Sequence, residues 1–197
     1  MPITKPVTLA AAVAVAATTV AAVAAGTTAA EAAPKTARVT GTADVRLTYW
    51  PDKDVRTFSF DAVSAPFTQP KNGAPDGLPT DARGTVKVSH WVADENVTVR
   101  FTAEVDCLAT SPGNAALTAV VKEADGPVAD WVGKRLGFSV QRDRVGFSWS
   151  VVNGVQNDKG EWEEAKTGTC MAPAAFAPAT RGGYKIRHAE LQPFPQK

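Results

Sequence analysis

Two histidines are the side chains best suited to general base catalysis near neutral pH, and they stand far apart in the sequence. His90 shares its strand parity with Val88, which favours a partly buried or strand-end histidine over a catalytic base. His188 shares its parity with Ile186 and is the weaker candidate. Serine hydrolysis needs a nucleophile, a base and an orienting acid that meet in space. Since no GxSxG pattern surrounds a serine, we predict no catalytic residue.

Acidic side chains gather in two places. Glu104 and Asp106 share one face of an expected strand, where paired carboxylates could act as acid and base, although a solvated face is the favoured explanation. A denser acidic stretch surrounds Trp162 at residues 158–164. Calcium prefers such oxygen ligands, but the EF-hand spacing is absent. We therefore predict no metal site, and whether this stretch binds an ion stays open.

Four tryptophans lie at expected strand ends or in loops: Trp50, Trp91, Trp131 and Trp162. A large rigid ring offers much contact area at little entropic cost, so exposed tryptophans often bind sugars, peptides or proteins. These four are our candidate ligand-binding residues. The alternative is that they plug the ends of the fold, and Trp149 is expected in the core.

Composition excludes several function classes. The formal net charge is +1, with basic and acidic residues spread along the chain, so no footprint for nucleic acid is present. No P-loop, dinucleotide-binding glycine pattern, CxxC or HExxH motif follows the leader. We expect no cofactor, and any partner would be an unidentified extracellular polymer or protein.

Residues 1–32 differ from the rest of the sequence. Lys5 precedes an almost uninterrupted Ala/Val/Thr stretch from Val7 to Ala25, which is typical of a signal peptide. Small residues at 30–32 suit cleavage, and a second triplet at 22–24 leaves its position open. A membrane anchor is the alternative, but Ala and Thr are only weakly lipophilic, so no stable membrane insertion is expected after cleavage.

The sequence after the leader predicts a flexible lead-in at residues 33–43 and a single β domain at 44–197. Export would place Cys107 and Cys170, the only two cysteines, in an oxidising compartment. A disulfide between them is therefore expected. We predict a secreted, extracellular protein.

Period-two alternation is the dominant pattern of this domain. Its clearest instance runs from Val97 to Cys107, with apolar residues on one face, and it places Cys107 on the inward side. Similar stretches lie at residues 45–49, 58–60, 86–88, 117–121, 136–140, 145–151 and 184–188, separated by turn signals. Their spacing predicts an all-β, antiparallel sandwich or barrel-like domain of about eight strands.

Several segments resemble secreted actinobacterial proteins labelled "repetin" or hypothetical exported protein. They are DVRLTYWPDKDVRTFSFDA from Asp44, GTVKVSHW from Gly84, VDCL from Val105, WVGKRLGFSV from Trp131 and DRVGFSW from Asp143, about half of the chain after the leader. The resemblance implies a compact exported β domain. It brings no activity and no catalytic or binding residue.

Three functional hypotheses follow. The first is a non-enzymatic, envelope-associated or interaction module, which fits the missing catalytic set. The second is an extracellular hydrolase that uses carboxylates such as Glu104 and Asp106. The third is an inhibitor of secreted enzymes, which would need a rigid exposed loop such as the proline-rich segment Gln69–Pro79.

Overall fold

Alternation of apolar and polar residues produces long strands along most of the chain. The computed structural model describes residues 36–149 and 152–196. Its strands are β1 (Arg38–Val45), β2 (Val55–Ser64), β3 (Ala82–Val92), β4 (Val97–Ser111), β5 (Asn114–Ala124), β6 (Arg135–Gln141), β7 (Arg144–Phe147), β8 (Gly154–Gln156), β9 (Trp162–Glu164) and β10 (Ala177–Arg187), with a short 3₁₀ helix η1 (Gly126–Trp131). The predicted antiparallel all-β fold is confirmed.

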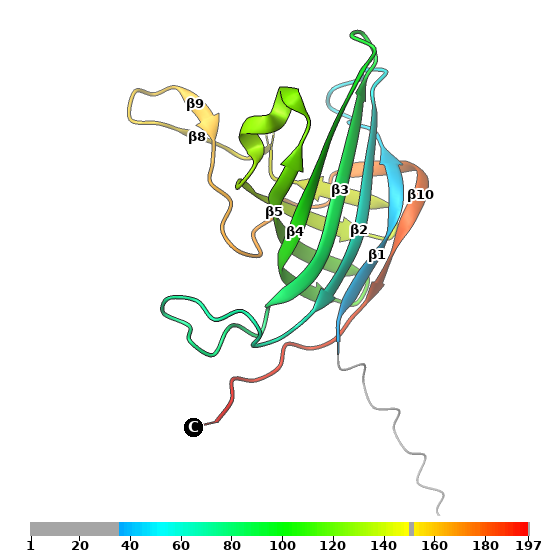
Figure 1. Cartoon of the computed structure of the whole chain (residues 1–197). Helices are drawn as coiled ribbons and strands as arrows, with labels where there is room; N and C mark the ends of the chain where they lie inside the picture. Colours follow the sequence, from blue (N-terminus) through cyan, green and yellow to red (C-terminus); the bar gives the residue numbers. More distant parts are fainter. Residues whose placement is uncertain (1–35, 150–151, 197) are drawn as a thin grey trace, which may run out of the picture. The chain divides into compact units, whose positions relative to one another are not determined.

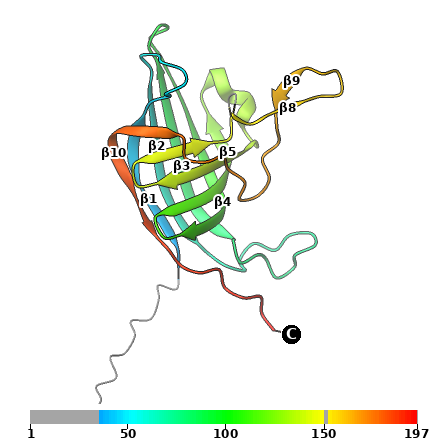
Figure 2. The same cartoon turned by 180° about the vertical axis from the view of Figure 1, so that it is seen from behind.

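Eight strands close into one barrel in the order β1-β10-β7-β6-β5-β4-β3-β2, as Figures 1 and 2 show. Each strand runs antiparallel to its neighbours, and β1 pairs with both β2 and β10. This closed strand order identifies the fold as a barrel. The sequence had left the choice between a barrel and a sandwich open. The strands of the wall are paired over different lengths. Strands β7 and β10 share only two residue pairs, Ala177 with Val145 and Pro178 with Arg144.

Inward-facing side chains fill the barrel over most of its length. An eight-stranded barrel is just wide enough inside for packed side chains or for one small ligand. The largest fully buried side chains include Phe58, Phe138, Phe147, Leu108, Leu117 and Leu136. Tyr184 of β10 meets Phe60 edge-on, with ring centroids 5.3 Å apart. Burial raises the pKa of the Tyr184 hydroxyl above its ordinary value.

Strand β1 corrects the expected domain boundary. It begins at Arg38, so the predicted flexible lead-in at 33–43 is wrong for residues 38–43. The sequence pattern did not reveal this strand because Gly41 occupies one of its inward positions. Glycine has no side chain, so the apolar alternation is interrupted there. A Cβ at Gly41 would collide with the backbone of β10, so the glycine is what lets the two strands approach.

The predicted strand at 45–49 is also wrong beyond Val45. The strand ends there, and residues 46–50 form an irregular turn. Leu47 is nevertheless buried, because it turns into the end of the barrel. The apolar residues that follow Val45 therefore belong to a turn, in which Leu47 is buried and Tyr49 is exposed.

A β-bulge places the disulfide outside the barrel. The pairing of β4 with β5 shifts between Val105 and Cys107, so that Cys107 faces Thr118 and Leu108 faces Leu117. Paired antiparallel residues share a face, and Leu117 points inward, so Cys107 points outward. The prediction of an inward Cys107 is wrong, since an unbroken alternation cannot reveal a bulge.

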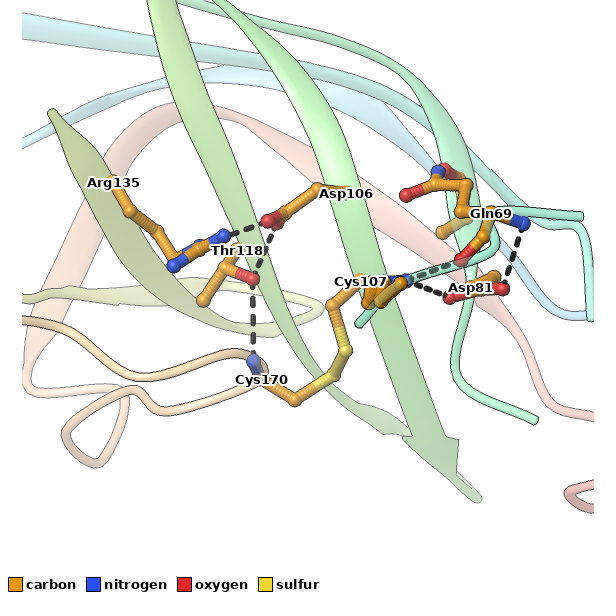
Figure 3. The surroundings of a disulfide bond; sticks show 9 residues. Gln69, Asp81, Asp106, Cys107, Thr118, Arg135 and Cys170 are labelled. Carbon is orange, nitrogen blue, oxygen red and sulfur yellow. Dashed lines mark hydrogen bonds and ion pairs between the residues drawn. A yellow bond between two sulfur atoms is a disulfide. The ribbon is translucent and has the colours of Figure 1, made fainter. Parts of the chain in front are cut away.

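The disulfide between Cys107 and Cys170 is confirmed, with Cα atoms 5.4 Å apart. It fastens the segment before β10 onto the outer face of the barrel, where the Cys170 N–H donates to Thr118 Oγ1 at 3.2 Å (Figure 3). Cys107 is fully buried, and an isolated β-bridge pairs it with Asp81. The disulfide therefore joins a long connection to the outer face of the wall and occupies no space inside the packed barrel.

Strands β8 and β9 form a separate hairpin that projects away from the barrel in Figure 1. Within residues 36–149 and 152–196, no helix has the length and apolar character needed to cross a membrane. The expected signal peptide at 1–32 lies outside the described residues.

Candidate functional site

One end of the barrel contains a cavity of about 320 Å³. Ligand pockets typically measure about 300–1,000 Å³, so this one suits a molecule of one or two rings. Its lining is aromatic (Phe58, Phe101, Trp131, Phe147, Trp149) and aliphatic (Leu47, Val88, Val99, Val128), with two polar residues, Arg56 and His90.

Strand register arranges this lining in two layers. Arg56 of β2 is paired with His90 of β3, which is paired with Val99 of β4. Two residues further into the barrel, Phe58 is paired with Val88, and Val88 with Phe101. Because residues i and i+2 of a strand share one face, the polar layer forms the rim and the aromatic layer forms the floor.

Trp149 lies at the centre of the aromatic side chains. Its ring centroid lies 4.4 Å from that of Phe147, 5.9 Å from Phe58 and 5.8 Å from Phe101. These separations lie in the range of favourable aromatic pairs, each of which contributes roughly 0.5–1.5 kcal/mol beyond burial. The prediction that Trp149 belongs to the core is incomplete, since its half-buried ring also lines the cavity.

Helix η1 supplies the side wall of the cavity. It connects β5 to β6 and ends at Trp131, whose ring centroid lies 5.9 Å from that of Trp149 in an edge-on arrangement. Lys134 Nζ lies 4.7 Å from the Trp131 ring centroid and donates to Glu164 Oε2 at 2.8 Å. The cation–π contact and the ion pair together hold Trp131 against the barrel end.

The rim is an ion-pair network built on Arg56. Its Nη1 and Nη2 donate to the two carboxylate oxygens of Asp52 at 2.9 and 2.6 Å, and Nη2 also donates to Asp54 Oδ2 at 3.0 Å. The bidentate geometry fixes the guanidinium plane. Hydrogen bonding from Arg56 lowers the pKa of Asp52 below its ordinary value, against the opposing effect of burial.

Asp54 extends the network to His90. Its Oδ2 lies 2.7 Å from His90 Nε2, and its Oδ1 accepts the Ala93 N–H at 2.9 Å. An ionised carboxylate only accepts hydrogen bonds, so Nε2 carries the proton and a neutral ring presents Nδ1 as an acceptor. The rim thus combines the donors of Arg56 with one acceptor on His90.

The structure separates the four tryptophans predicted to bind ligand. Trp131 lines the cavity. Trp50 and Trp91 lie at the same end of the barrel, on the β1–β2 connection and at the end of β3, and both are exposed. Trp162 lies on the β8–β9 hairpin and is 66% exposed.

The remaining candidates have partners of their own. Glu104 lies 3.2 Å from Lys122 on the outer wall, and Asp106 accepts hydrogen bonds from Thr118 and Arg135. His188 bonds to Thr110 and Glu190 at the opposite end of the barrel. In the part of the chain that the structure describes, no three His, Cys, Asp or Glu residues are grouped as a metal site.

Sequence reasoning missed Arg56, Asp52 and Asp54. A signal was present: Arg56 precedes Phe58 and Phe60 by two and four residues, so parity alone places a charged side chain on the inward face. An inward charge needs a partner, and the nearest carboxylates are Asp52 and Asp54.

No family model matches this chain, and neither the curated proteins nor the solved structures yield a match.

Proposed function

We propose that this chain is an exported, non-enzymatic binding protein whose barrel holds one small, ring-bearing, largely apolar molecule. The observation that carries the proposal is the aromatic cavity of about 320 Å³ at one end of an otherwise filled barrel. Aromatic walls with a few placed polar groups are the usual composition of a small-molecule site.

The energetics of packing support a ligand. A cavity next to a close-packed core is destabilising, because its lining atoms lose dispersion partners. The contacts of Lys134 with Trp131 and Glu164 restrain one side of the cavity, and the hydrogen bonds of Arg56 with Asp52 restrain another. A site whose side chains are restrained in this way is preorganised, which favours binding.

Export is supported by two features. The buried disulfide between Cys107 and Cys170 suits an oxidising compartment. Residues 1–32 have the composition of a secretory leader. The ligand would then be met outside the cytoplasm, where the exposed rings of Trp50 and Trp91 could contact any part of it that protrudes from the cavity.

Equilibrium dialysis with naphthalene and with indole tests the proposal. We expect saturable binding of one molecule per chain. Trp131→Ala should weaken it at least tenfold, since tryptophan side chains in central positions dominate binding energies. Trp162→Ala is the matched control, because that ring is exposed on the hairpin, and it should leave the affinity unchanged.

Two results would contradict the proposal. One is the absence of saturation with both probes. The other is equal affinity of the Trp131→Ala and Trp162→Ala proteins, with circular dichroism confirming that both are folded.

A second candidate is the inhibitor of secreted enzymes. The observation in its favour is that the loop containing Gln69–Pro79 is held by the buried carboxylate of Asp81, which accepts the backbone N–H groups of Gln69 and Leu78 at 2.9 Å. Inhibitory loops need such rigidity. Assays against a panel of secreted proteases would test it, and no inhibition by micromolar protein would remove it.

A further inference from the structure

The polar rim specifies the chemical group that the ligand carries. We infer that the cavity selects an uncharged aromatic alcohol or phenol, whose hydroxyl accepts a hydrogen bond from Arg56 and donates one to His90. This inference rests on the proposed function and deepens it.

Arg56 retains donors for a ligand. A guanidinium has five N–H groups, and the bonds to Asp52 and Asp54 run only from Nη1 and Nη2. Within residues 36–149 and 152–196, Nε–H therefore has no protein partner. Because Arg56 lines the cavity, an oxygen of the ligand can take that place.

His90 supplies the opposite capability. Its Nε2–H is committed to Asp54, so Nδ1 of the neutral ring is an acceptor without a partner among the described residues. His90 also lines the cavity. A ligand group that only accepts hydrogen bonds would leave His90 Nδ1 without a donor. A hydroxyl can accept a hydrogen bond from Arg56 and donate one to His90.

The two side chains approach the cavity from neighbouring positions. Arg56 and His90 are directly opposite each other across β2 and β3, and both face the barrel interior. Opposed residues of antiparallel strands have Cβ atoms about 4.5–5.5 Å apart. The floor of Phe58 and Phe101 begins one layer further in, so a hydroxyl at the rim places the ring among the aromatic side chains.

Charge excludes an anionic head group. Asp52 and Asp54 outnumber the single guanidinium that they flank, and both lie within 3.0 Å of it. These three side chains together therefore carry a net negative charge. A carboxylate or phosphate would be repelled and would lose a strongly bound hydration shell on entry, whereas an uncharged hydroxyl is not repelled and costs much less to desolvate.

Equilibrium dialysis with four matched probes tests the inference: naphthalene, 2-naphthol, 2-methoxynaphthalene and 2-naphthoate. We expect 2-naphthol to bind about tenfold more tightly than naphthalene, since hydrogen bonds to a charged group are among the stronger ones. The methoxy compound can only accept, so it should fall between them. The naphthoate should bind most weakly.

Variants of His90 test whether the ligand hydroxyl donates its hydrogen bond to this residue. His90→Phe should abolish the difference between 2-naphthol and 2-methoxynaphthalene, and His90→Gln, which restores an acceptor, should recover most of it. His188→Gln is the matched control at the opposite end of the barrel and should behave like the unmodified protein. If His90→Phe does not fold, the four probes on the unmodified protein remain decisive.

The outcomes separate the two claims. Equal binding of naphthalene and 2-naphthol, or tightest binding of 2-naphthoate, overturns the hydroxyl inference and leaves the proposed function standing. Equal binding of 2-naphthol and its methyl ether overturns the role of His90. Failure of all four probes to bind overturns the proposed function itself.

Discussion

The two ends of strands β2 and β3 use similar chemistry for different purposes. At one end, Asp81 is 1% exposed, and its carboxylate accepts hydrogen bonds from Lys71 and from backbone N–H groups of its own loop. At the other end, Arg56 and its two aspartates stand beside His90, which is 35% exposed at the cavity.

The two ends differ in whether their polar groups all have hydrogen-bond partners within the protein. Asp81 is surrounded by donors, and the nearby Cys107, which pairs with it in an isolated bridge, is covered and covalently fixed. Arg56 and His90 keep a donor and an acceptor without protein partners among the described residues. A saturated network stabilises a fold, whereas an unsaturated one beside a cavity can recognise a ligand. We call the end of the barrel at Asp81 the closed end and the end at Arg56 and His90 the open end. The closed end should therefore govern stability, and the open end should govern ligand affinity.

The largest effect should follow from removing the disulfide. Replacing both Cys107 and Cys170 with serine should lower the free energy of unfolding by roughly 4 kcal/mol, because the bridge closes a loop with a sequence separation of 63 residues. Urea denaturation measures this, and the naphthalene affinity of the folded protein should not change. A large loss of affinity in a folded variant would break the proposed division between the ends.

Asp81→Asn should have the next largest effect. The substitution removes a buried charge acceptor and leaves Lys71 without its partner, which should cost about 2 kcal/mol. Thermal unfolding at pH 7 measures the change. Asp61→Asn, which alters an exposed ion pair with Arg38, is the control and should stay within about 0.5 kcal/mol. Similar losses for the two variants would show that the closed end is not specially stabilised.

Acid should erase the Asp81 effect. Burial opposes ionisation of Asp81, but hydrogen bonds from Lys71, Leu78 and Gln69 outweigh it and hold the pKa below the ordinary value of 3.8. The contribution is therefore present above pH 3.8 and is lost as the pH falls through the lower folded pKa. The stability gap between the unmodified protein and Asp81→Asn should shrink over that window in urea titrations. A gap that widens towards acid would reverse the assigned direction.

The smallest effect on stability should come from the exposed ring at the open end. Trp50 is 64% exposed, so Trp50→Ala should change the free energy of unfolding by no more than about 0.5 kcal/mol. Urea denaturation provides the measurement, with Trp162→Ala as a second exposed ring for comparison. A loss above about 2 kcal/mol would place Trp50 among the stabilising side chains instead.

The sequence predicted the wall of the barrel better than its ends. In β2 to β5, apolar residues at every second position mark the inward face directly. The same rule failed at β1, where Gly41 interrupts the pattern, and at Cys107, where the bulge reverses the facing. The candidate site was predicted only through Trp131, because the other three tryptophans lie outside the cavity.

The sequence by itself determined the fold class and the pairing of the two cysteines, because alternation and the number of cysteines are local or countable properties of the chain. Only the tertiary structure decided that β1 closes on β10, so that Arg56, His90, Trp131 and Trp149 surround one cavity. The pairing of distant strands and the packing of their side chains create that space, and the spacing of residues along the chain does not encode it.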